Sequence, residues 1–90
     1  MEDKVCNEGV YIHVNGKTGG WRVGESRNVA ARAARTLRGN QHCLGAEKDV
    51  QTFVLRTCGL PSGQRKALEK SVIDLLSEIR PAGQCNLIRR

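Results

Sequence analysis

Hydrophobic and polar side chains alternate near the start of the chain, over residues 8–14. The aliphatic positions are Val10, Ile12 and Val14, and they alternate with Tyr11 and His13. A period of two is typical of a β-strand whose side chains point to opposite faces in turn. We therefore predict a strand whose aliphatic face meets a core, while Tyr11 and His13 lie on the other face.

A second strand is predicted at about residues 20–24. Asn15-Gly16 and Gly19-Gly20 are turn signals, so the two strands should form a hairpin. The returning strand places Trp21 and Val23 on one face, and Arg22 and Gly24 on the other. With the expected pairing, Arg22 shares a face with Tyr11.

Helical periodicity then appears twice, with a strand-like stretch between. Ser26 is a good N-cap for a helix over about 27–38, and Gly39 is a plausible end. Residues 40–49 are predicted to be a loop or short turn, and the β-branched stretch 50–56 a strand. A second helix should run from Pro61-Ser62 to about residue 80, where Pro81 ends it. Its amphipathic stripe consists of Leu68, Val72, Leu75, Leu76 and Ile79.

These elements give the order β-β-α-β-α in a small α/β protein. Ninety residues are enough for one domain, so residues 1–90 are treated as a single domain. The patterns do not determine the order of the strands in the sheet.

The charge of the chain favours a polyanionic partner. The chain has fifteen Lys and Arg residues and nine Asp and Glu residues, which gives a net charge of +6. Basic surfaces attract phosphates and release their counterions. No apolar run approaches the roughly 20 residues that span a bilayer, so no membrane partner is expected.

The four cysteines, Cys6, Cys43, Cys58 and Cys85, are widely spread and include no C-x-x-C pair. No apolar leader precedes them. We interpret them as reduced thiols of an intracellular protein, either cytoplasmic or nucleoid-associated. A zinc site at His42-Cys43 is a weaker alternative, because the usual close ligand pairs are absent.

One ordered set of residues resembles the signature of the GIY-YIG nuclease family. Gly9-Val10-Tyr11 is followed by Arg22-Val23-Gly24, and then by a helix that opens with Ser26-Arg27-Asn28-Val29 and carries Arg32. The resemblance continues through the segment around Glu69 to Asn86. It implies a three-stranded, mostly antiparallel sheet flanked by helices. It also implies a metal-dependent DNA endonuclease, which hydrolyses phosphodiester bonds.

The resemblance implies five catalytic positions: Tyr11, Arg22, Arg32, Glu69 and Asn86. Glu69 would hold Mg²⁺ or Mn²⁺, since Mg²⁺ prefers oxygen ligands and often takes only one or two from protein. Arg32 would bind a phosphate with its forked donor set. Tyr11 would orient or deprotonate the attacking water, and Asn86 would support the site by hydrogen bonding.

Arg22 departs from the family pattern, because many relatives carry a tyrosine at this position. Arginine stays protonated and cannot act as a general base, although it can bind phosphate. The sequence therefore leaves open an alternative: a catalytically impaired GIY-YIG-fold protein that binds nucleic acid or acts as an adaptor. A small basic protein that blocks another macromolecule is a third, weaker reading.

The expected DNA-facing residues are Lys17, Arg27, Arg35 and Arg38, together with Arg22. The chain has no second DNA-reading module, so specificity would come from loops, a homodimer or a partner protein. Binding should be dominated by phosphate contacts and should depend steeply on salt.

Structural roles for the same residues remain open. Tyr11 suits an ordinary half-buried strand position, and Glu69 suits an ion pair with Arg65 one helical turn earlier. Arg32 suits a solvated helix face, and Asn86 a turn. His13 is interpreted as a surface histidine more readily than a catalytic one, and His42 as a loop residue that some relatives place in the site.

Overall fold

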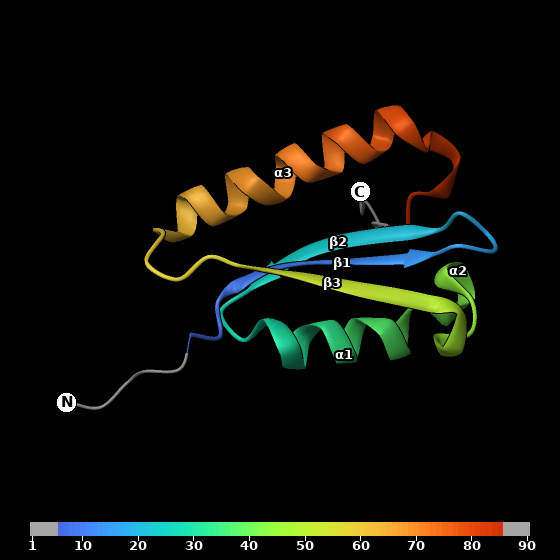
Figure 1. The fold of residues 1–90 in the computed structure, drawn as a ribbon, viewed down its shortest axis with the longest axis horizontal. Coiled ribbons are helices and arrows are strands. Elements are labelled where there is room, and N and C mark those ends of the chain that lie inside the picture. Colours follow the sequence, from blue (N-terminus) through green and yellow to red (C-terminus); the bar gives the residue numbers. More distant parts are fainter. Residues whose placement is uncertain (1–5, 86–90) are drawn as a thin grey trace.

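Three strands form one antiparallel sheet in the computed structural model, which describes residues 6–85. They are β1 (Gly9–Asn15), β2 (Trp21–Ser26) and β3 (Val50–Arg56), and β1 lies in the centre of the order β2-β1-β3. Figure 1 shows the two long helices, α1 and α3, on opposite faces of this sheet. The predicted α/β class, the flanked antiparallel sheet and the β-β-α-β-α order are confirmed.

The helices are α1 (Val29–Gly39), α2 (Gln41–Leu44) and α3 (Ser62–Ile79). Two short 3-10 turns, Glu47–Asp49 and Pro81–Gly83, precede β3 and follow α3. The bounds of β3 and α3 agree with the sequence prediction. The segment 40–49, predicted as a loop or short turn, contains α2 and a 3-10 turn.

The β1–β2 hairpin has the predicted register. Tyr11 lies opposite Gly24 and His13 lies opposite Arg22, so Arg22 does share a face with Tyr11. The turn is closed by the Asn15 backbone N–H, which donates to the Gly20 carbonyl at 2.9 Å. The Asn15 side chain adds a buried hydrogen bond to the Leu44 carbonyl at 2.7 Å, which joins the hairpin to α2.

The core lies on both faces of β1. On the α3 face, Val10, Trp21 and Val23 are fully buried and pack against partly buried residues of α3. These residues are Leu68, Val72, Ile73 and Leu76. On the α1 face, Tyr11 packs against Val29 and Ala33. The aliphatic alternation of β1 therefore faces α3, as its period of two predicts.

Two details of the helix predictions are wrong. The first helix begins at Val29 and is capped by Asn28, whose side chain accepts from the Ala31 N–H, because Ser26 is still part of β2. In α3, Leu75 and Ile79 are not buried: their exposed fractions are 56% and 61%. The helix covers β1 and β2, and this side of the predicted stripe extends beyond them.

The expectation of reduced cysteines is also wrong, because the structure joins all four. Cys6 pairs with Cys58, and Cys43 pairs with Cys85. The first pair follows from topology: Gly9 lies opposite Arg56, so the residues just before β1 and just after β3 are neighbours. The second pair excludes Cys43 as a zinc ligand in this structure. Among the described helices, none is long and apolar enough to cross a membrane.

Candidate functional site

A basic pocket of about 420 Å³ lies at the end of β2, where the first turns of α1 and α3 approach it from opposite faces of the sheet. Its cationic side chains come from three segments and are Arg27, Arg32, Arg65 and Lys66. The other lining residues are Glu25, Ser26 and Ser62. Arg65 is paired with Glu25, and the three further cations make this pocket suited to an anion such as a phosphate.

Arg65 is the buried cation of this pocket. Its Nε donates to the Glu25 carboxylate at 2.6 Å, and its Nη1 lies 3.6 Å from the Glu8 carboxylate. Only 5% of the Arg65 side chain is exposed. The ion pair is therefore an internal link between α3 and β2. The alternative pairing of Arg65 with Glu69 is not what the structure shows. Arg27 and Arg32 are exposed and are the pocket's accessible arginines.

Glu69 lies one helical turn after Arg65 and is partly buried. Burial raises the pKa of its carboxyl group, and the nearby Glu25 carboxylate raises it further. Lys66 and Arg22 act in the opposite direction and lower this pKa. A carboxylate that is partly desolvated and close to another negative charge favours an additional cation nearby.

Tyr11 is only 2% exposed, and its ring crosses β2 at Gly24. A Cβ atom at position 24 would collide with the Tyr11 hydroxyl and ring, so only glycine allows this packing. The spacing of the G-V-Y and R-V-G motifs thus has a packing explanation in this chain: Gly24 makes room for Tyr11.

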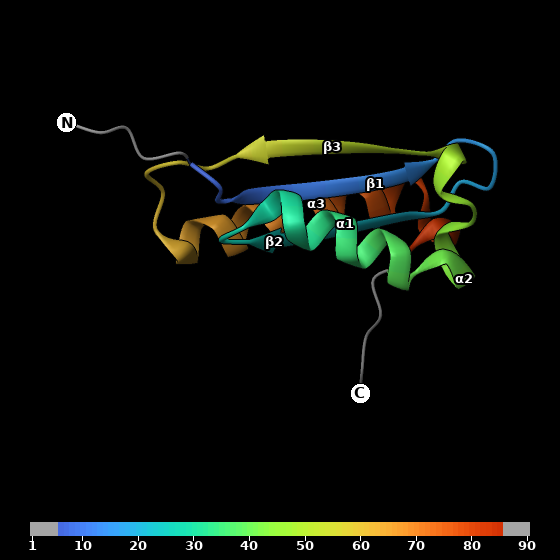
Figure 2. The same cartoon turned by 90° about the horizontal axis from the view of Figure 1, so that it is seen from below.

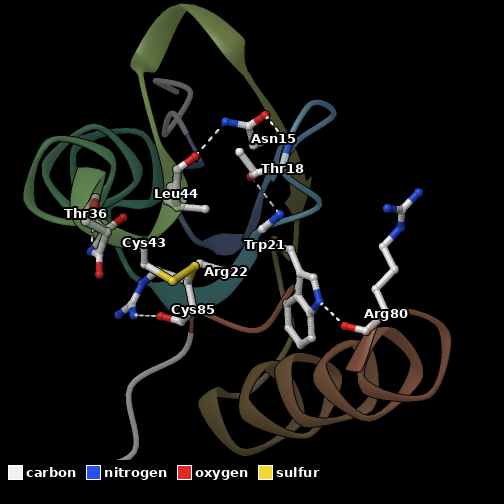
Figure 3. The surroundings of a disulfide bond; sticks show 11 residues. Asn15, Thr18, Trp21, Arg22, Thr36, Cys43, Leu44, Arg80 and Cys85 are labelled. Atoms are coloured by element: carbon white, nitrogen blue, oxygen red, sulfur yellow. Dashed lines mark hydrogen bonds between the residues drawn. A yellow bond between two sulfur atoms is a disulfide. The ribbon is translucent and has the colours of Figure 1, made fainter. Parts of the chain in front are cut away.

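Arg22 lies on the same face as Tyr11 and is directed to the Cys43–Cys85 disulfide (Figure 3). Its Nη1 donates to the Cys85 carbonyl at 3.1 Å, whereas its Nε is buried without a hydrogen-bond partner in the described part of the chain. The Cys85 N–H in turn donates to the Trp21 carbonyl at 2.6 Å. Arg22 therefore helps to hold the segment that precedes Asn86 against β2.

His13 is a core residue, which corrects the expectation of a surface histidine. Its side chain is fully buried on the α1 face. Its Nε2 lies 3.0 Å from the Ala33 carbonyl, which can only accept, so Nε2 carries the proton. Its Nδ1 then accepts from the Thr52 hydroxyl at 2.8 Å. Burial lowers the pKa of His13 and outweighs the raising effect of the Ala33 hydrogen bond, while Arg22 lowers it further.

The burial of His13 predicts a stability that falls as the pH drops below about 6.5, the ordinary pKa of histidine. In that range His13 gains a proton in the unfolded chain but not in the folded chain. The free energy of unfolding therefore falls by up to about 1.4 kcal/mol per pH unit, until the pH reaches the lowered pKa of His13 in the folded protein. Urea unfolding of wild type and His13→Gln between pH 5 and 8 measures this.

The His13→Gln variant should be less stable at pH 8 but should have a flatter pH dependence. Subtracting the two profiles removes the contribution of Glu69, whose raised pKa favours the folded state at low pH and so acts in the opposite direction. Parallel profiles for the two proteins would contradict the assignment of the slope to His13.

Not all predicted site residues lie near this pocket. Lys17 is in the hairpin at the opposite end of β2 and forms an ion pair with Asp49 at 3.4 Å. Arg35 and Arg38 are exposed on α1 but do not line the pocket. His42 is an exposed residue of α2. Asn86 lies outside the described residues.

Sequence reasoning missed three charged residues of the pocket, namely Glu25, Arg65 and Lys66. The sequence could have indicated Glu25. It directly follows Gly24 of the predicted strand, so its side chain must point to the α3 face, opposite to Arg22. Arg65 precedes Glu69 by one turn, and the sequence indicates it only as the ion-pair partner of that residue. In residues 6–85 there is no cluster of three or more His, Cys, Asp or Glu side chains that could hold a metal ion.

Comparison of the chain with protein-family models, with curated proteins and with solved structures gives no match. The resemblance to the GIY-YIG nucleases therefore rests on the residues of the chain itself.

Proposed function

We propose that this protein is a metal-dependent DNA endonuclease of the GIY-YIG type. The observation that carries the proposal is the basic pocket at the end of β2, together with the partly buried carboxylate of Glu69, which interacts electrostatically with two of the lining residues, Glu25 and Lys66. Phosphodiester hydrolysis needs cations for the phosphate and a carboxylate for a metal ion, and the pocket and Glu69 would supply them.

Arg32 and Arg27 are the proposed phosphate ligands. Both are exposed and line the same pocket, although they come from α1 and from the segment before it. The buried Arg65–Glu25 ion pair fixes the opposite wall. The first turn of α3 contributes Ser62, and unpaired N–H groups at a helix N-terminus also favour an anion.

Glu69 is the proposed metal ligand, and its surroundings fit a divalent cation. Its pKa is raised by burial and by Glu25, so a bound cation would relieve the repulsion between two carboxylates. Mg²⁺ commonly takes one or two carboxylates and keeps several waters, which is compatible with the lack of a larger ligand cluster among residues 6–85. When bound, Mg²⁺ or Mn²⁺ would stabilise charge on the phosphoryl oxygens and acidify water.

Tyr11, Arg22 and Asn86 complete the proposal with supporting roles. The Tyr11 hydroxyl lies against Gly24 of β2 on the α1 face of the sheet, and it would orient the attacking water. Arg22 holds the Cys85 carbonyl and thereby the segment that leads to Asn86. Arg35, Arg38 and Lys17 are proposed as outer phosphate contacts, with Lys17 serving DNA only if the duplex reaches the far end of the hairpin.

The alternative is a catalytically impaired nucleic-acid-binding or adaptor protein. Two observations favour it: Tyr11 is almost completely buried, and Arg22 is engaged with a backbone carbonyl. Incubation with supercoiled plasmid in Mg²⁺, Mn²⁺ or EDTA separates the readings. Relaxed or linear product that needs metal supports the endonuclease. No product with either metal, together with a retained gel shift, supports the alternative.

Replacement of Arg32 by alanine should weaken DNA binding and lower the slope of log affinity against log salt by about one. Lys48→Ala is the matched control, because it also removes one exposed positive charge but lies in the 3-10 turn before β3. Fluorescence anisotropy with a labelled duplex at several salt concentrations measures both. Equal losses for the two variants would show that only net charge matters.

The compartment and the partners are part of the same proposal. An intracellular location remains a prediction, while the two disulfides favour a compartment that does not reduce them. DNA is the proposed partner, and a homodimer or a second protein would supply specificity.

A further inference from the structure

β3 is one of the two edge strands of the sheet, and it exposes apolar side chains. Phe53, Val54 and Leu55 are 51%, 38% and 42% exposed, although they are consecutive residues of a strand. Figure 2 shows β3 to one side of both long helices. Because successive side chains alternate, both faces of this edge expose apolar surface: Phe53 and Leu55 on the α3 face, and Val54 on the α1 face.

The hydrogen-bonding pattern shows which backbone groups of β3 point outward. The Asn15 N–H donates to Gly20, so odd-numbered residues of β1 bond to β2 and even-numbered residues bond to β3. The Thr57 N–H accordingly donates to the carbonyl of Glu8. On β3, the even positions Val50, Thr52, Val54 and Arg56 therefore direct their N–H and C=O groups away from the sheet.

Such an edge is a template for another strand. Natural edge strands are usually protected by charged residues, proline or a bulge, but residues 50–55 contain no charge and no proline. We infer that β3 pairs with β3 of a second copy of this chain, antiparallel and about a twofold axis through Phe53, so that the dimer contains one six-stranded sheet.

The register of this pairing follows from the outward positions. With Phe53 on the axis, Thr52 lies opposite Val54 and Val50 lies opposite Arg56, and both pairs exchange backbone hydrogen bonds. Phe53 then lies opposite its own copy in a non-hydrogen-bonded pair, where side chains approach most closely and an aromatic pair is favourable.

Charge at the strand ends selects an antiparallel copy. The 3-10 turn before β3 carries the exposed Glu47 and Lys48 and the partly buried Asp49, which is paired with Lys17, and β3 ends at the exposed Arg56. Antiparallel pairing places Arg56 of each copy at the end of the seam where Glu47 of the other copy lies. A parallel arrangement would instead place Arg56 beside Arg56.

An exposed residue of α3 lies where it would cover the new seam. Glu69 is on the side of the buried α3 stripe that approaches Glu25 of β2, so Leu75, on the other side of the stripe, is turned toward β3. A twofold axis perpendicular to the sheet keeps both α3 helices on one face, above the two Phe53 side chains. On the other face, an apolar groove of about 280 Å³ between α1 and β3 is lined by Ala30, Ala34, Leu37 and Val54.

This inference does not depend on the proposed nuclease activity. β2 and β3 are the two opposite edges of the sheet, so the dimer leaves both basic pockets open at its outer edges. Failure of the dimer would leave the endonuclease proposal intact, and absence of cleavage would leave the dimer intact.

The first experiment is the mass of the wild-type protein in solution by light scattering or sedimentation, beside Val54→Pro. Proline at an outward position removes an N–H that makes no bond within the sheet of the monomer, so the monomer should fold, while pairing to a second strand is blocked. We expect a dimer for wild type and a monomer with an unchanged circular dichroism spectrum for Val54→Pro. A wild-type protein that remains monomeric up to submillimolar concentration would overturn the inference.

A second experiment tests the register by cross-linking. Oxidised Phe53→Cys should form a covalent dimer through the introduced thiols, whereas Gln51→Cys should not, since its position on the same face lies opposite Leu55 of the other copy. Peptide mapping confirms that both native disulfides are retained. Equal cross-linking of the two variants, or none for Phe53→Cys, would contradict pairing about Phe53 even if a dimer forms.

Discussion

Replacement of Glu69 by glutamine should reduce metal-dependent plasmid cleavage by about a hundredfold or more, with little change in DNA affinity. Glutamine keeps the shape of the side chain and its place on α3, but it removes the negative charge that would hold a divalent cation. The basic pocket is formed by other residues, so binding of the phosphate backbone should persist. Initial rates in Mg²⁺ and a gel shift in EDTA measure the two effects separately.

Glu78→Gln is the matched control for this experiment. Glu78 is an exposed glutamate of the same helix, whereas Glu69 is partly buried. The same loss in both variants would indicate an effect of net charge rather than of a metal site. Full activity of Glu69→Gln would remove Glu69 from the mechanism and would leave the carboxylate of Glu25, which pairs with Arg65, as the acidic group that lines the pocket.

Much of the fold can be predicted because local patterns decide it. The period-two alternation of β1 and the glycine turn after it are sufficient for the hairpin and its faces. The bounds of β3 and α3 are also confirmed, since Pro61 and Pro81 limit the second helix. The start of α1 differs because Ser26 and Asn28 are both good caps, and strand pairing at Ser26 decides between them.

Features that depend on long-range contacts cannot be predicted in this way. Spacing along the chain does not indicate that Cys6 meets Cys58, because their proximity follows from the β1–β3 pairing. Helical periodicity places Leu75 and Ile79 in the core, because it cannot show how wide the supporting sheet is. At the candidate site, Arg27 and Arg32 share a pocket that Glu69 does not line, and Lys17 lies at the far end of β2, because it is part of the hairpin turn.

The second large effect concerns the Cys43–Cys85 disulfide. Its removal in the Cys43→Ser/Cys85→Ser double variant should lower the free energy of unfolding substantially. The bond closes a loop with a sequence separation of 42, and closure of such a loop contributes about 4 kcal/mol in the chain-entropy model. That is a large fraction of the roughly 5–15 kcal/mol by which native domains are stable. Urea unfolding of the variant beside wild type measures the loss.

The double variant Cys6→Ser/Cys58→Ser is the matched control. Its disulfide has a similar separation of 52, so a similar loss of stability is expected. The two bonds differ in what they hold: Cys85 receives the hydrogen bond of Arg22, a proposed site residue, and donates to Trp21 at the hairpin end of β2 (Figure 3), whereas Cys6 and Cys58 lie next to the ends of β1 and β3. Loss of the Cys43–Cys85 bond should therefore also lower cleavage at temperatures where both variants remain folded.

Equal cleavage by the two variants would show that the Cys43–Cys85 bond contributes only stability. The same comparison in wild type, with and without a thiol reductant, tests the compartment. If the reduced protein unfolds or loses cleavage, it cannot act in a reducing cytoplasm, and the predicted intracellular location fails. If the reduced protein remains folded and active, its core and ion pairs are sufficient without the disulfides, and the intracellular location stands.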